Sequence, residues 1–153
     1  MSGVTWDQCR RGFEWDGSLR DIYVLNASIA DWDTFIQTLP GMSYRTEFLI
    51  DDEAAILPAV AMALFDRRAD HAPLLRLFAG SVMLHCHFFS DQELEFDLDP
   101  REVQGALEFQ GVLDFMRNVG GVLDKPVILT PENQPERPMI SFDPRGGQFQ
   151  WHE

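Results

Sequence analysis

The chain has 153 residues, of which 25 are Asp or Glu and 12 are Lys or Arg, so its formal net charge is −13. This excess of negative charge disfavours binding to nucleic acids and to anionic membranes, because both are polyanions. Apolar residues make up 45% of the chain, which is typical of a globular protein rather than a disordered one. Length and composition therefore predict one domain over residues 1–153, with a core that requires no cofactor.

The cysteines and the first residues indicate a cytoplasmic protein. Cys9 and Cys86 lie far apart in the sequence and suggest no disulfide framework, which fits a reducing compartment. Residues 1–15 contain four charged side chains and no apolar run, so we expect no signal peptide. The longest apolar stretch, residues 54–65, contains Pro58 and is too short to span a membrane.

The first part of the chain predicts an arm, two strands and a helix. Residues 1–18 are expected to form an irregular arm, with a short edge strand around Phe13 as the alternative. A strand buried on both faces is predicted over residues 21–26, because this stretch is β-branched and aromatic. Residues 28–39 have helical apolar spacing, with Ser28 as N-cap and Asp31 three residues later. Alternating side chains then predict a strand over residues 44–50.

The middle of the chain predicts a helix and a three-stranded meander. The helix is expected over residues 57–68, with Pro58 in its first turn and Val60 on its buried face. Alternation and turn residues then predict strands over residues 74–79, 82–89 and 93–98.

The last third predicts one long helix and three strands. Asp99-Pro100-Arg101-Glu102 is a typical helix start, and the helix that follows is expected to break near Gly105 and to end near residue 123. Strands are predicted over residues 125–130, 139–143 and 148–152. This order predicts the α+β class, with a mostly antiparallel sheet and about three helices packed on one face.

The sequence His85-Cys86-His87 lies in a predicted strand and allows two interpretations. Residues two apart project from the same face, so His85 and His87 could bind one metal ion, with Glu93 or Glu95 of the next strand as a third ligand. Alternatively, both imidazoles are hydrogen-bonding groups on a half-exposed face. Cys86 projects from the other face, so we expect a buried thiol and assign no catalytic residue.

Acidic residues concentrate in the last strand of the meander. Glu93, Glu95 and Asp97 alternate with apolar residues, so the three carboxylates are predicted to share one face. One interpretation is a solvated edge strand whose charge prevents aggregation. The other is a surface that attracts a basic partner, and Asp51, Asp52 and Glu53 are candidates to join it.

Three stretches of the sequence support a resemblance: Phe13 to Val24, Glu95 to Val103, and Lys125 to Asn133. Together they resemble a family of small uncharacterised bacterial proteins. In size, charge and general shape the chain is also similar to the small acidic α+β immunity proteins that neutralise toxins. The resemblance implies no residue roles.

These observations favour a non-catalytic acidic binding protein, immunity-like in character, that presents a carboxylate-lined strand to a basic protein. The alternative is a metal-dependent small-molecule enzyme that uses His85, His87 and a nearby carboxylate. A third hypothesis is a subunit of a homodimer that pairs through an exposed strand.

Overall fold

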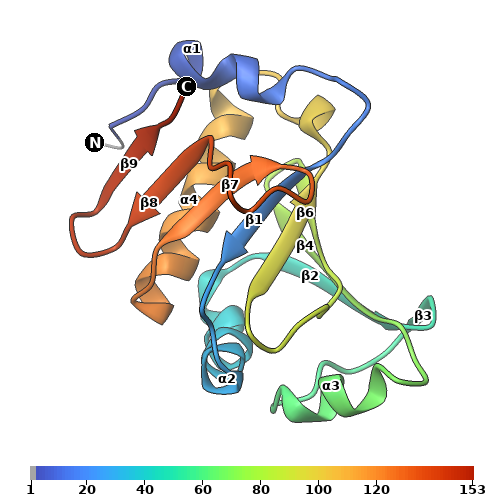
Figure 1. Ribbon diagram of the computed structural model, residues 1–153. Helices are drawn as coiled ribbons and strands as arrows, with labels where there is room; N and C mark the ends of the chain where they lie inside the picture. The colour runs from blue at the N-terminus through green and yellow to red at the C-terminus, as the bar shows by residue number, and fades with distance from the viewer. Residues whose placement is uncertain (1–2) are drawn as a thin grey trace.

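The computed structural model describes residues 3–153, and its nine strands belong to one antiparallel sheet (Figure 1). The order across the sheet is β3-β2-β4-β5-β6-β1-β7-β8-β9. The strands are β1 (Arg20–Val24), β2 (Arg45–Ile50), β3 (Glu53–Ala54), β4 (Pro73–Ala79), β5 (Val82–Cys86), β6 (Leu94–Leu98), β7 (Val127–Pro131), β8 (Ile140–Asp143) and β9 (Gln148–Trp151). The prediction of a mixed α+β fold with a mostly antiparallel sheet is confirmed.

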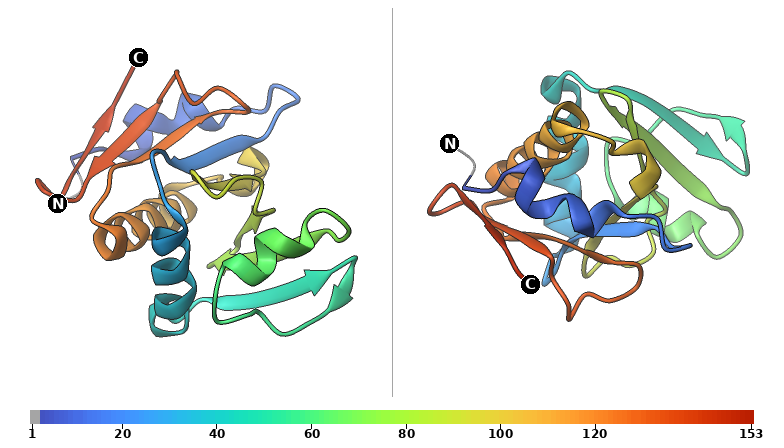
Figure 2. Two further views of the ribbon diagram at one scale, coloured as in Figure 1. Left: turned by 60° about the horizontal axis from the view of Figure 1, so that its bottom comes forward. Right: turned by 90° about the horizontal axis from the view of Figure 1, so that it is seen from above.

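The helical elements are α1 (Trp6–Cys9), η1 (Arg10–Phe13), α2 (Ile29–Thr38), η2 (Leu39–Met42), α3 (Met62–Arg67), η3 (Pro100–Glu102) and α4 (Ala106–Leu123). The long helix α4 contacts both α2 and the sheet, whereas α3 lies at the β3 end of the molecule (Figure 2). Within residues 3–153 no helix is both long and apolar enough to cross a bilayer.

Part of the N-terminal arm that was predicted to be irregular is helical: α1 and η1 span residues 6–13, so the alternative of an edge strand around Phe13 is wrong. Residues 1–2 of the predicted arm lie outside the described residues. The two short helices are held by Arg20, whose side chain is 4% exposed. The guanidinium of Arg20 donates to the carbonyl oxygens of Gly12 (2.6 Å), Glu14 (2.7 Å) and Ser18 (3.1 Å). Because a buried guanidinium needs several acceptors, it fixes the arm against the start of β1.

Two predicted elements form as their local sequence requires. Every residue of β1 is buried, as expected for a strand covered on both faces. At the start of α2, the hydroxyl of Ser28 accepts from the Asp31 N–H, and the Asp31 carboxylate accepts from the Ser28 N–H. This reciprocal pair satisfies two N–H groups that a helix start otherwise leaves without partners.

The helix predicted over residues 57–68 is shorter than expected. It begins at Met62, and Pro58 lies in the segment before it. The carboxylate of Asp33 in α2 accepts from the Ala61 N–H at 2.7 Å, which sets the start of α3. Val60, which was predicted to be buried, is 51% exposed.

Strand β5 also ends early, at Cys86 instead of residue 89. Phe88 has a φ of 57°, in the left-handed region, so regular strand geometry does not continue to residue 89. The alternation of buried and exposed side chains nevertheless continues, and the Phe88 ring is buried beside Trp32, with 5.2 Å between ring centroids. The cost of the unusual backbone conformation is offset by this aromatic packing.

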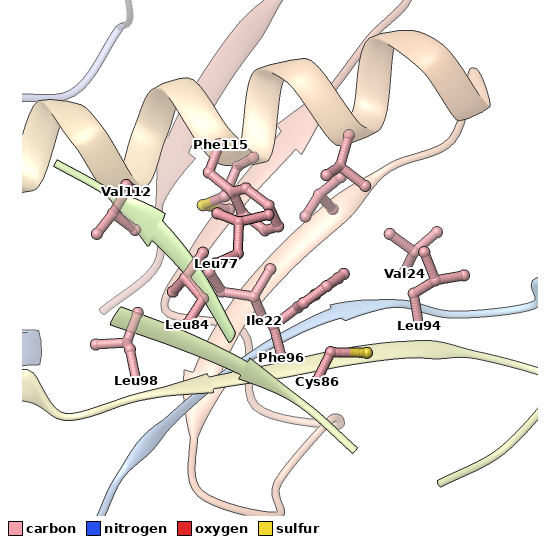
Figure 3. Packing of buried hydrophobic residues seen from close by; sticks show 14 of the residues in the cluster. Ile22, Val24, Leu77, Leu84, Cys86, Leu94, Phe96, Leu98, Val112 and Phe115 are labelled. Atoms are coloured by element: carbon pink, nitrogen blue, oxygen red, sulfur yellow. The ribbon is translucent and has the colours of Figure 1, made fainter. Parts of the chain in front are cut away.

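Helix α4 supplies the main apolar contact of the sheet. A short helical turn, η3, precedes it, and α4 begins after Gly105, so the predicted break is confirmed. Val112 and Phe115 of α4 face Leu77 and Ile22 of the sheet in one fully buried cluster (Figure 3). At Gly120 the helix lies so close to the sheet that a Cβ atom would be 2.9 Å from the Phe142 ring.

Two neighbouring glycines of α4 allow a test of this close packing. Gly120→Ala is expected to lower the free energy of unfolding by about 1 kcal/mol, because the added methyl group would overpack against Phe142. Gly121→Ala, whose Cβ would meet nothing within 4 Å, is expected to raise it by about 0.5–1 kcal/mol. Urea denaturation followed by circular dichroism measures both. Stabilisation by both substitutions would contradict the contact.

Candidate functional site

A row of polar residues crosses the sheet in register. The row takes one residue from each of the strands from β2 to β7, and in every neighbouring pair of these strands the two residues are cross-strand partners. Cross-strand partners project from the same face of a sheet, so the side chains of the row share one face. The row is Glu47, Arg76, His85, Asp97, Asp21 and Thr130. We call the side of the sheet that carries this row the polar face.

His85 and His87 lie beside one carboxylate on the polar face. The Nδ1 atom of His85 is 3.4 Å from Oδ1 of Asp97, and Nε2 of His87 is 3.4 Å from Oδ2. Burial is the largest single influence and raises the pKa of Asp97, but hydrogen bonds to the two imidazoles and their charge together outweigh it, so the pKa is lowered. Asp97 is therefore an ionised carboxylate held between two histidines.

The carboxylate nearest to the histidines differs from the expected one. Glu93 or Glu95 was predicted as the third member of a metal site, but Glu93 precedes β6, Glu95 stands opposite Tyr23, and the register pairs His85 with Asp97. Glu93 instead lines a cavity of about 660 Å³ with residues 25–27, Ser90 and Gln92. Within residues 3–153 no group of three or more His, Cys, Asp and Glu side chains is arranged to hold a metal ion.

Strand β6 is central, so its interpretation as a solvated edge strand is wrong. It lies between β5 and β1 and is the fifth strand in the sheet order, with four strands on either side. The alternation within β6 is as predicted: Leu94, Phe96 and Leu98 are buried, and Glu95 and Asp97 are partly exposed. We call Glu93, Glu95 and Asp97 the acidic strip.

A second group of titratable side chains adjoins the acidic strip on β1. The Asp21 carboxylate, only 2% exposed, accepts from the Tyr23 hydroxyl at 3.0 Å and from the Asn133 N–H at 2.7 Å. Burial raises the pKa of Asp21, and the negative charge of Asp97, directly opposite, raises it further despite these hydrogen bonds. Burial and the negative charges of Asp21 and Glu95 likewise raise the pKa of Tyr23.

Glu95 stands opposite Tyr23 and lacks a cationic neighbour. Burial is the main cause of its raised pKa, and the charges of Asp21, Glu93 and Asp97 add to it. None of the ion pairs within residues 3–153 involves Glu93 or Glu95. The polar face thus concentrates the carboxylates of Asp21, Glu95 and Asp97, with the imidazoles of His85 and His87 beside Asp97.

Aromatic rings follow the acidic strip on the neighbouring strand. The His85 and His87 rings are stacked with centroids 6.3 Å apart, and His87 stacks on Phe89 at 5.0 Å. Phe89 is 54% exposed, and the guanidinium of Arg68 lies 5.4 Å from its ring centroid. Alternation along the sequence already places Phe89 on the same face as His85 and His87, but Phe89 carries no titratable or metal-ligating group and was not among the predicted site residues.

The other predicted acidic residues lie elsewhere. Asp51 and Asp52 form the turn between β2 and β3, and Glu53 begins β3 at the edge of the sheet. Asp51 accepts from the Ala72 N–H and is 2.7 Å from Nδ1 of His71. Because β4 and β5 separate β2 from β6, these residues do not join the acidic strip.

The two cysteines, Cys9 and Cys86, do not contribute side chains to the polar face. Cys86 is 1% exposed on the core side of β5, as predicted, and burial raises its pKa. Burial also raises the pKa of Cys9 to about 11, and neither cysteine forms a disulfide. A thiol with a raised pKa is a poor nucleophile, because the reactive species is the thiolate.

Comparisons with known proteins give no relative from which to transfer a role. No family model, no curated protein and no solved structure matches the chain significantly.

The environment of Asp21 predicts a pH-dependent effect on stability. Because its pKa is raised in the folded state, the stability that Asp21 contributes is complete below its unfolded pKa and is lost as pH rises through the folded value. Asp21→Asn keeps an acceptor for Tyr23 and Asn133 without the charge, so we expect it to raise the free energy of unfolding at pH 7 by about 1 kcal/mol.

Denaturation at several pH values measures this effect, and the advantage of Asp21→Asn should disappear towards acidic pH. Asp21→Ala is the control: it leaves the Tyr23 hydroxyl and the Asn133 N–H without their acceptor and should destabilise the fold. If Asp21→Asn were less stable than the wild type at pH 7, the carboxylate would be a net stabilising group and this account would be wrong.

Proposed function

We propose that the chain is a non-catalytic binding protein whose polar face takes a basic protein partner. We further infer that α2 and α4 cover the opposite face of the sheet, which leaves for binding the β5–β6 part of the polar face, where Glu95, Asp97 and the two histidines are partly exposed. The observation that carries the proposal is the group formed by Asp21, Glu95 and Asp97, three carboxylates on two adjacent strands. Their mutual repulsion is costly in the free protein, and a cation placed beside them would relieve it.

The neighbouring aromatic rings support arginine as the group recognised. A guanidinium can pair with a carboxylate through two parallel hydrogen bonds and can also stack on an aromatic ring. Glu95 and Glu93 offer the carboxylates, and the exposed part of the Phe89 ring, which is 54% exposed, offers an apolar contact for the guanidinium. Arg68 already lies over the Phe89 ring within the chain, which supports the compatibility of this ring with a guanidinium.

The immunity-like form of the proposal names a basic toxin domain as the partner. Support for it comes from the net charge of −13 and from the resemblance in size and class to small acidic immunity proteins. Complementary charge would speed the association and make it sensitive to salt.

The proposal predicts a position-specific effect of charge removal. Glu93→Gln/Glu95→Gln is expected to weaken binding of a short Arg-rich peptide about tenfold, which corresponds to ~1.4 kcal/mol. Asp52→Asn/Glu53→Gln removes the same charge from the β2–β3 edge and should change the affinity less than about twofold. Fluorescence anisotropy in moderate salt measures the affinities, and a peptide with citrulline in place of arginine should not bind.

Equal weakening by both double variants would contradict a binding site on the acidic strip, because binding would then depend on net charge alone. Absence of binding by the wild-type chain would contradict the proposal as a whole.

A further inference from the structure

Two histidines share one carboxylate of the acidic strip. The Nδ1 atom of His85 and the Nε2 atom of His87 each lie 3.4 Å from an oxygen of Asp97. The side chains of His85 and His87 are 32% and 38% exposed, so protons from solvent reach both rings. Histidine is the side chain whose ordinary change of charge falls between pH 5 and 8. The charge of the surface that carries the acidic strip therefore depends on pH.

Two arginines adjoin the histidines, and neither contributes to this pH dependence. Arg76 stands opposite His85 on β4, and its guanidinium lies 3.6 Å from the Glu47 carboxylate. Arg68 donates to the Phe89 carbonyl at 2.8 Å. Arginine stays protonated in proteins, so both side chains keep a constant charge.

Carboxylates face the histidines from the next two strands. Asp97 stands opposite His85, and Glu95 and Asp99 lie two residues from it on either side. Asp99 forms an ion pair of 2.8 Å with an arginine of η3, and Asp21 lies behind Asp97 on β1. With both imidazoles neutral, no cationic side chain of residues 3–153 forms an ion pair with Asp97 or Glu95. These two carboxylates are then available to a cation of the partner.

We propose that protonation of His85 and His87 releases the partner, so that the chain holds its basic partner at neutral pH and loses it as the pH falls. The inference rests on the proposed function, because it concerns the same surface. Each protonated ring adds one positive charge beside Asp97. The two charges repel an arginine of the partner and compete with it for the same carboxylate.

The separation of the charges sets the expected size of the effect. Diagonal neighbours on two antiparallel strands are roughly 7 Å apart, and a guanidinium bound beside Glu95 would be diagonal to His85. Two unit charges at this distance in water repel each other by about RT. Each protonated histidine therefore weakens binding about threefold, and the two together weaken it about sevenfold. By linkage, binding of the partner must in turn release protons from the histidines.

Other titratable groups nearby act in the same direction and have to be separated from the histidines. Burial raises the pKa of Glu95 and of Asp21, so both also take up protons as the pH falls. Tyr23, whose pKa is raised by burial, stays neutral over this range. Loss of affinity at low pH therefore does not identify the histidines, whereas a variant without them does.

The test uses His85→Gln/His87→Gln, because glutamine keeps an N–H donor for Asp97 and does not titrate. Fluorescence anisotropy with the Arg-rich peptide gives Kd at pH ~7.5 and at pH ~5.5, between which arginine keeps its charge. The double variant should bind within about twofold of the wild type at the higher pH. The ratio of the two Kd values should be about sevenfold larger for the wild type than for the double variant. His71→Gln removes a histidine at the other edge of the sheet and should keep the wild-type ratio.

Calorimetry in two buffers of different ionisation enthalpy provides a second measurement. Binding should release protons from the wild type and fewer from the double variant. Equal Kd ratios for the wild type and the double variant would overturn this inference and leave the proposed function intact. Unfolding of the wild type at the lower pH, followed by circular dichroism, would also overturn it, since release would then result from loss of the fold. Absence of binding at the higher pH would contradict the proposed function and this inference with it.

Discussion

The register of β6 between β5 and β1 determines the chemistry of this protein. Leu94, Phe96 and Leu98 are at most 1% exposed, and burial of each such side chain contributes roughly 1.5–3 kcal/mol. A shift of the β6 register by one residue would expose all three side chains and direct the carboxylates of the strand into the core. Unpaired charges there cost far more free energy than they do in water. Packing in the core therefore fixes the position of Asp97 beside His85 and opposite Asp21.

Local sequence patterns predicted the elements whose stability depends on near neighbours. The alternation in β4 and β6, the capping box of Ser28 and the break at Gly105 each follow from residues a few positions apart. The order of strands does not follow from such patterns, since it depends on which distant segments pair. For this reason β6 was open to interpretation as an edge strand, although it lies near the middle of the sheet.

The candidate site could be predicted only in part, because alternation within a strand is visible in the sequence and the pairing of strands is not. Period-two alternation placed His85 and His87 on one face and Cys86 on the other, whereas the choice between Glu93, Glu95 and Asp97 needed the cross-strand register. Asp21 was a missed signal, because a carboxylate in a strand expected to be buried on both faces requires hydrogen-bond donors. One donor, Tyr23, lies two residues from Asp21 in the sequence, whereas the other, Asn133, is brought to it only by the fold.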